Sequence, residues 1–233
     1  MKTKVFKRVE EKYLITALQY YQLLDLLKEE FIPDEYGFNT IHNIYFDTKD
    51  YDLIRKSLEK PIYKEKIRLR GYGKLNQNSL VFLEIKKKYN GLVGKRRTSM
   101  YLKDYYQYQN KKILPNQSQI MHEINYCYKN YQLMPKVYLA YDRFGYFAKN
   151  NHDFRITFDT NIHYRLNDLH VEKDLNTKLL INKETYLLEV KTLDAIPIWF
   201  SKILNNLKIY PISFSKYGEV YKNILKEGMI THV

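Results

Sequence analysis

The chain has 233 residues, a formal net charge of +13, and 45% hydrophobic and 15% aromatic residues. This length suits one large domain or two small ones with a sizeable core, and the composition excludes a disordered or low-complexity chain. The positive charge predicts a polyanionic partner, which could be nucleic acid, an anionic membrane surface or a phosphate-rich ligand.

The same composition bears on the compartment. A single cysteine, Cys127, excludes an intrachain disulfide framework and fits a reducing environment. Residues 1–8 lack the apolar segment of a secretory signal, and no apolar run approaches the ~18 residues of a membrane span. We therefore expect a cytoplasmic protein without a transmembrane segment. Cys127 lies on an apolar helical stripe and is expected to be inert.

The first part of the chain is predicted to alternate strands and helices. A strand is expected over residues 6–14, followed by a helix that Thr16 caps and that runs to about residue 30. A second strand is expected over residues 40–46, and a short helix over residues 51–57.

The middle of the chain favours three strands, at residues 66–70, 80–88 and 95–101. Asn90-Gly91 between the last two is typical of a tight turn and predicts a hairpin. Residues 103–134 are predicted to be helical with an interruption at Pro115-Asn116.

The remaining chain favours further strands and two closing helices. The strands are expected over residues 137–147, 154–164 and 186–192, and the helices over residues 198–207 and 215–226. Strands predominate and helices are inserted between them. The pattern predicts the α+β class, built around a large antiparallel sheet or barrel.

Charged side chains recur on one face of several predicted strands. Because successive side chains of a strand point to opposite faces, Lys66, Arg68 and Arg70 share one face and Ile67 and Leu69 the other. In the other strands the same alternation groups further charged or polar residues on one face: Glu84, Lys86 and Lys88; Arg155, Thr157 and Asp159; Glu189 and Lys191.

Two interpretations of these faces remain open from the pattern alone. They could simply face water, as one side of an antiparallel sheet often does, or bind RNA. Carboxylates at Glu10, Glu84, Asp159 and Glu189 lie among the cations, however, and a surface for phosphates alone would not gain from them. A site for phosphates and a divalent metal needs both charges. We therefore predict a barrel with a charged interior and helices outside.

The order of the charged motifs resembles the triphosphate tunnel metalloenzymes, and among them the polyphosphate polymerase domain of the vacuolar transporter chaperone (VTC) complex and its stand-alone bacterial relatives. The resemblance covers about residues 5–225. Its motifs are Arg8-x-Glu10-x-Lys12, Tyr45-Phe46-Asp47-Thr48, Arg68-x-Arg70, Glu84-x-Lys86, Lys95-x-Arg97, Arg143-Phe144, Arg155-x-x-x-Asp159-Thr160, Leu188-Glu189-Val190-Lys191 and Ser215-Lys216-Tyr217.

The resemblance implies a single domain over residues 1–233, folded as an eight-stranded antiparallel tunnel. It implies that the γ-phosphate of ATP is transferred to a growing inorganic polyphosphate chain, with Mn²⁺ or Mg²⁺ as the cofactor. ATP, polyphosphate and pyrophosphate are then the expected ligands, and nucleic acid is not expected as a partner.

The resemblance also implies roles for individual residues. Catalysis would fall to Lys12, Arg68, Arg70, Arg143, Arg155 and Lys216. Further phosphate contacts would come from Arg8, Lys66, Lys86, Lys95, Arg97, Lys191 and Ser215. The metal would be held by Glu189, Glu84 and Glu10.

Several alternatives stay open. Hydrolytic tunnel enzymes open with Glu-x-Glu-x-Lys, whereas Arg8 holds the first position here, which disfavours a triphosphatase or polyphosphatase without excluding it. A non-catalytic polyphosphate- or RNA-binding module is the other alternative. Glu84 and Glu189 could be plain salt-bridge partners, and the proton could be transferred by Glu10 or Asp159. Asp47-Thr48 is interpreted as a turn and helix cap.

Overall fold

The computed structural model describes residues 8–90, 92–193 and 195–229. The chain forms two compact units that are interleaved along the sequence. Unit 1 comprises the described residues within 1–39, 141–162 and 181–215, and unit 2 those within 40–140, 163–180 and 216–233. The expectation of a single domain over residues 1–233 stays a prediction.

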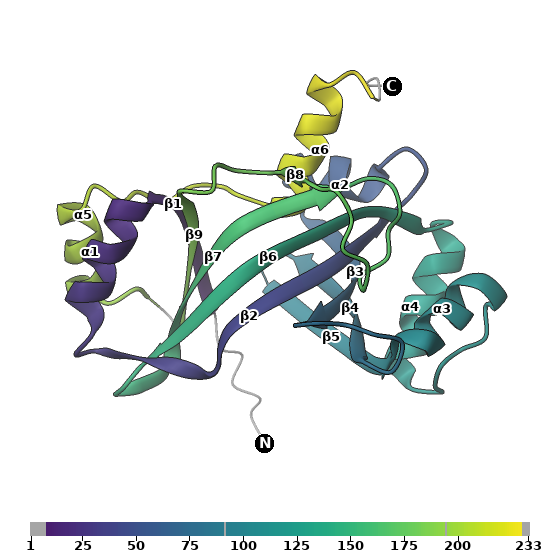
Figure 1. The fold of residues 1–233 in the computed structure, drawn as a ribbon, viewed down its shortest axis with the longest axis horizontal. Helices are drawn as coiled ribbons and strands as arrows, with labels where there is room; N and C mark the ends of the chain where they lie inside the picture. Colours follow the sequence, from purple (N-terminus) through teal and green to yellow (C-terminus); the bar gives the residue numbers. More distant parts are fainter. Residues whose placement is uncertain (1–7, 91, 194, 230–233) are drawn as a thin grey trace. The chain divides into compact units, whose positions relative to one another are not determined.

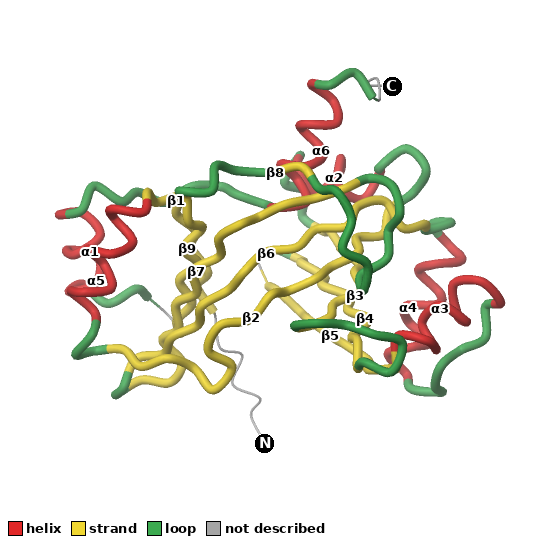
Figure 2. Tube along the Cα trace, in the orientation of Figure 1, coloured by secondary structure: helices red, strands yellow, loops and turns green. Residues whose placement is uncertain are grey.

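The described strands form one nine-stranded sheet whose hydrogen-bonded order is β1-β9-β7-β6-β2-β3-β4-β5, with β8 paired to β7 (Figure 2). Strands β2 (Phe31–Asp47), β6 (Met134–Ala148) and β7 (Asn151–Arg165) each contribute residues to both units. The α+β class with a large antiparallel sheet is confirmed. Closure of this sheet into an eight-stranded tunnel stays a prediction.

Unit 1 packs two helices on one face of its strands. It contains β1 (Arg8–Thr16), α1 (Ala17–Leu27), β9 (Thr185–Leu193) and α5 (Ile198–Asn206), and α1 lies beside α5 (Figure 1). Its core joins apolar residues of these strands and helices, including Ile15, Leu23, Phe158, Val190 and Phe200.

Helix α1 begins as the sequence predicts and ends earlier. The Thr16 side chain accepts a hydrogen bond from the Gln19 backbone N–H, and the Gln19 side chain accepts one from the Thr16 N–H. This reciprocal capping box fixes the first turn of the helix. The helix ends at Leu27, because residues 28–30 form a turn that leads directly into β2. Tyr21 of this helix is 63% exposed.

Besides parts of β2, β6 and β7, unit 2 contains four strands and four helices among its described residues. In chain order these elements are α2 (Asp52–Leu58), β3 (Tyr63–Tyr72), β4 (Leu80–Tyr89), β5 (Leu92–Tyr101), α3 (Leu102–Lys111), α4 (Gln119–Asn130), β8 (Lys178–Leu179) and α6 (Lys216–Lys226). The predicted break in the helical segment separates α3 from α4, where Ser118 caps the second helix by accepting from the Met121 N–H. Helices α3 and α4 lie against β4 and β5 (Figure 1).

The β3–β4 register separates the apolar and charged faces of unit 2. Ile67 lies opposite Ile85 and Leu69 opposite Leu83, and all four are buried in the core beneath α3 and α4. Because side chains alternate, the intervening residues Lys66, Arg68 and Arg70 lie on the other face. None of the helices described is both long and apolar enough to cross a membrane.

Candidate functional site

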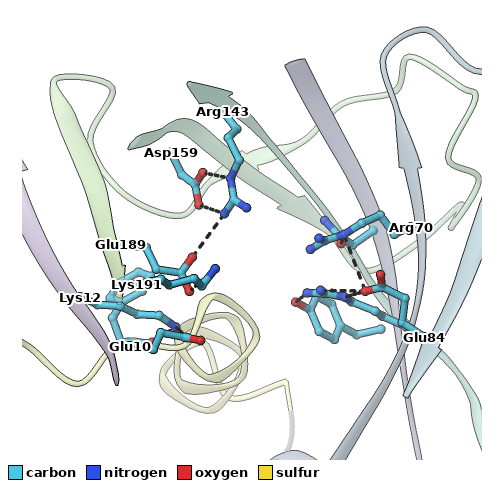
Figure 3. A network of polar contacts seen from close by, with 12 residues as sticks. Glu10, Lys12, Arg70, Glu84, Arg143, Asp159, Glu189 and Lys191 are labelled. Atoms are coloured by element: carbon cyan, nitrogen blue, oxygen red, sulfur yellow. Dashed lines mark hydrogen bonds and ion pairs between the residues drawn. The ribbon is translucent and has the colours of Figure 1, made fainter. Parts of the chain in front are cut away.

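The charged face of unit 2 is centred on Glu84, whose side chain is 1% exposed. Arg68 contacts the Glu84 Oε2 with Nε at 2.9 Å and Nη2 at 2.8 Å, and Lys95 Nζ lies 2.7 Å from Oε1 (Figure 3 shows Glu84 with Arg70). Arg70 Nε is 4.0 Å from Oε2. Burial alone would raise the pKa of Glu84, but the three cations outweigh it and lower the pKa to about 2. Glu84 is therefore an ion-pair partner of three predicted phosphate-binding residues.

Neutral side chains fix the two arginines in place. Arg70, which is largely buried, donates from Nε to the Asn43 Oδ1 at 3.0 Å, and the Asn43 amide donates in turn to the Leu139 carbonyl. Arg68 donates from Nη1 to the Tyr45 hydroxyl at 3.1 Å. Asn43 was not singled out from the sequence, because an asparagine on a buried strand carries no charge pattern.

Lysines lie directly opposite one another across the same three strands. The register pairs Lys66 with Lys86 and Lys86 with Lys95, and it pairs Lys64 with Lys88. Burial lowers the pKa of Lys64, and Lys88, Lys60 and Lys86 lower it further. Like charges directly opposite in a sheet are destabilising. A row of this kind favours an anionic ligand that would relieve the repulsion.

Lys95 and Arg97 complete this face from β5. Burial lowers the pKa of Lys95, and the nearby charges of Arg70 and Arg68 lower it further. Pairing with Glu84 raises the pKa again, but only in part. The Arg97 guanidinium lies over the Phe82 ring, 4.6 Å from its centroid.

The start of α6 is anchored to unit 2 by a tyrosine. The Tyr217 hydroxyl donates to the Asp47 Oδ2 at 2.8 Å, and its ring stacks on Tyr45 with centroids 4.8 Å apart. Lys216 is the first residue of this helix, and Ser215 precedes it. Asp47 also accepts from the backbone N–H groups of Thr48 and of residues 53 and 54, so it caps α2 as interpreted from the sequence.

Unit 1 carries a second charged cluster, in which Arg143 is held by Asp159. Arg143 donates from Nε and Nη2 to the two Asp159 oxygens at 2.6 and 2.7 Å, and its Nη2 lies 3.5 Å from the Glu189 Oε2 (Figure 3). Burial opposes the charge on Arg143, but Asp159 and then Glu189 help to raise its pKa. Both Asp159 oxygens are engaged and the residue is fully buried. This geometry suits orientation of Arg143 better than proton transfer by Asp159.

Glu10 and Glu189 meet on neighbouring strands of unit 1. The β1–β9 register pairs Glu10 with Lys191 and Lys12 with Glu189. Lys12 Nζ is 3.6 Å from the Glu10 Oε1 and donates to the Phe214 carbonyl, while Lys191 Nζ is 3.3 Å from the Glu189 Oε1 (Figure 3). Burial raises the pKa of Glu189, but the two lysines, a hydrogen bond with Glu10 and Arg143 together lower it. Two adjacent carboxylates of this kind are oxygen ligands suited to a hard divalent cation.

Arg155 is held at one end of the same face by a carboxylate that sequence reasoning missed. It lies opposite Lys191 across the β7–β9 pair and donates from Nη2 to the Asp34 Oδ2 at 3.0 Å. Gly145 permits this approach, because a Cβ at that position would collide with the Asp34 carboxylate. Asp34 follows a proline in a stretch without strand alternation, so no pattern in the sequence marks it.

The predicted site residues thus fall into one cluster per unit. The side chain of Arg8 lies outside the described residues, although its backbone pairs with Leu193. Within the part of the chain that the structure describes, no group of three or more His, Cys, Asp or Glu is arranged to hold a metal. Cys127 is buried, and burial together with Glu65 raises its pKa to about 11, which fits an inert thiol.

One solved structure agrees with this architecture, and a second is more distantly similar. A Bacillus halodurans protein provisionally assigned as an adenylate cyclase superposes with a TM-score of 0.53 at 14% identity, over 90% of this chain and 95% of its own. The PH1819 protein from Pyrococcus horikoshii OT3 gives a TM-score of 0.48 at 14% identity, over 94% and 98%. At 14% identity, the likeness to the Bacillus halodurans protein indicates a shared fold only.

Sequence comparison identifies the family. No curated protein sequence matches the chain. The VTC domain family matches residues 7–225, which is nearly the whole chain and agrees with the extent of the resemblance seen in the charged motifs. The chain therefore belongs to the VTC domain family.

Proposed function

We propose that the protein is a metal-dependent phosphotransferase that makes inorganic polyphosphate by transferring the γ-phosphate of ATP to a growing chain. Membership of the VTC domain family supports phosphoryl transfer. The observation that carries the proposal is the polar face of β3, β4 and β5, where lysines and arginines surround the buried Glu84 and lysines face lysines. A chain of phosphates would neutralise such a face along its length.

The cations of this face suit the oxygens of a phosphate chain in different ways. The guanidinium groups of Arg68, Arg70, Arg143 and Arg155 can donate two parallel hydrogen bonds to one phosphate, whereas lysines supply mobile point charges. The carboxylates that now hold the arginines keep them aligned. We propose that further contacts to the phosphates come from Lys12, Lys66, Lys86, Lys95, Arg97, Lys191, Ser215 and Lys216.

The polymerase requires that the sheet close into a tunnel, which the family resemblance implies. A water-poor interior would strengthen each contact between a cation and a phosphate. Phosphoryl transfer depends on positioning and charge neutralisation, so no side chain is assigned as a nucleophile.

Glu10 and Glu189 fit a divalent metal better than Glu84 does. They come from adjacent strands of unit 1 and contact each other, whereas the oxygens of Glu84 face Arg68 and Lys95. Mg²⁺ is commonly held by one or two carboxylates together with substrate phosphates, and Mn²⁺ favours the same oxygen ligands. When bound, the metal would neutralise charge that develops on the transferred phosphoryl group. The metal assignment therefore narrows to Glu10 and Glu189, with Glu84 as an ion-pair partner.

Incubation of the purified protein with ATP and Mn²⁺, followed by gel analysis of chain length, tests the proposal. We expect long phosphate chains from the wild type, and a loss of at least a hundredfold in rate for Glu189→Gln. Glu184→Gln, an exposed carboxylate just before β9, serves as the matched control and should keep full activity.

Two other outcomes would replace the proposal. Release of inorganic phosphate without chains would identify a triphosphatase or polyphosphatase. Polyphosphate or RNA binding that persists after chelation of metal, and that Glu189→Gln does not change, would identify a non-catalytic binding module.

A further inference from the structure

A groove lined in part by aromatic side chains adjoins the charged cluster of unit 1 at Arg155. It has a volume of about 500 Å³ and is lined by Pro33, Asp34, Glu35, Phe147, His152 and Arg155. The Phe147 and His152 rings contact each other with centroids 4.7 Å apart and an interplanar angle of 31°. The groove therefore combines two neighbouring aromatic rings with two carboxylates and one arginine.

Arg155 connects this groove to the predicted phosphate contacts. It lines the groove and lies directly opposite Lys191 in the neighbouring strand, and Thr157, two residues further along, lies opposite Glu189. Two residues of a strand span roughly 6.6 Å. A single ligand could therefore reach from the aromatic surface to the Lys191 and Glu189 side chains if one end were planar and the other anionic.

We propose that this groove binds the nucleoside part of a nucleoside triphosphate whose phosphates lie on the charged cluster of unit 1. The inference rests on the proposed function and adds the place where the donor nucleotide is recognised. The base would stack on the rings of His152 and Phe147, and Arg155 would contact the first phosphates.

The carboxylates of the groove complete the recognition. Asp34 already accepts from Arg155 and from the Tyr36 N–H, so it orients the arginine. Glu35 is exposed at the groove and can accept hydrogen bonds from ribose hydroxyls or a base amino group. Inorganic polyphosphate has neither an aromatic face nor such donors. It should therefore make no use of the groove.

Parallel binding of ATP and inorganic tripolyphosphate by isothermal titration calorimetry tests this inference. For Phe147→Leu and for His152→Ala we expect ATP to bind about tenfold more weakly, because stacking of a base on an aromatic ring is lost. Tripolyphosphate should bind both variants within twofold of the wild type. His152 is exposed, so its replacement should leave folding intact.

Phe144→Leu is the matched control. Phe144 is an aromatic residue of the same strand whose ring packs on Phe38, 5.1 Å away, and it does not line the groove. It should change neither affinity. The inference is overturned if both groove variants bind ATP and tripolyphosphate equally more weakly, or if their affinity for ATP is unchanged. Either result leaves the proposed polymerase function standing. A wild type that binds neither ligand overturns the inference and the proposed function together.

Discussion

Glu84 is the residue whose environment predicts the clearest dependence on pH. Its pKa falls from 4.5 to about 2 in the folded protein because Arg68, Arg70 and Lys95 outweigh the effect of burial. Because the pKa is lower in the folded protein, ionised Glu84 stabilises the fold at pH values above its ordinary pKa of 4.5. This stabilisation is lost as the pH falls from about 4.5 to about 2. The shift corresponds to about 3 kcal/mol.

Glu84→Gln should therefore lower the free energy of unfolding at pH 7 by about 3 kcal/mol, since it leaves three cations without their shared anion. It should also flatten the fall in stability between pH 4.5 and pH 2. Urea unfolding across that range measures both effects. Glu123→Gln is the control, because Glu123 pairs with Lys87 and Arg96 at a more exposed position where such pairs contribute at most about 1 kcal/mol. Equal pH dependence in wild type and Glu84→Gln would contradict the assignment.

At the same scale, the sequence placed Glu84 among cations but left two roles open. The alternation of side chains along the strand placed Glu84 on the charged face, where it could be an ion-pair partner. The resemblance to the family motifs implied instead that Glu84 is a metal ligand. The register between the strands decides between these two roles. It brings Arg68 and Arg97 opposite Glu84, so the oxygens of Glu84 face cations. Register depends on pairing between distant segments, so local alternation could not predict it.

At the scale of elements, the position of α6 depends on one buried hydroxyl. Tyr217 and Asp47 are each at most 2% exposed, and their hydrogen bond ties the first turn of the helix to the end of β2. Tyr217→Phe should lower the free energy of unfolding by about 1–2 kcal/mol, because the aspartate loses one of its four donors in a buried setting.

Chemical unfolding measures that loss. Tyr221→Phe is the comparison, because Tyr221 lies one turn further along α6 with its ring against Tyr51. This substitution should lower the free energy of unfolding by less than Tyr217→Phe does. We also expect Tyr217→Phe to weaken tripolyphosphate binding, since the neighbouring residue Lys216 begins the same helix. An unchanged stability would show that backbone donors alone hold Asp47.

Elements with strong periodicity were predictable, and those without it were not. The alternation in residues 66–70 and 80–88 predicted β3 and β4, and the Thr16 cap predicted the start of α1. In contrast, the sequence predicted a strand from residue 40, whereas β2 begins at residue 31. Residues 32–39 contain Pro33 and Gly37 and none of them is buried, so they show no alternation that would indicate a strand. The two-residue strand β8 exists only through its pairing with β7, a tertiary contact that no local pattern encodes.

At the scale of the whole molecule, each unit has its own apolar core and its own charged cluster. One core gathers around α1 and α5, and the other around α3 and α4. The alternation in residues 66–70 predicted an apolar strand face, but it gave no reason for two cores in place of one. The interleaved chain segments that build each unit follow from the strand order, which again depends on distant pairings.

The part that each unit plays in phosphate binding can be tested separately by calorimetry with inorganic tripolyphosphate. We expect Lys12→Ala in unit 1 and Arg68→Ala in unit 2 each to weaken binding, because each substitution removes a cation from the charged cluster of its own unit. Binding should also weaken as salt is raised from about 0.01 to 0.15 M, because the Debye length shortens from about 30 to 8 Å. A variant that binds tripolyphosphate as tightly as the wild type would show that the charged cluster of its unit takes no part in phosphate binding.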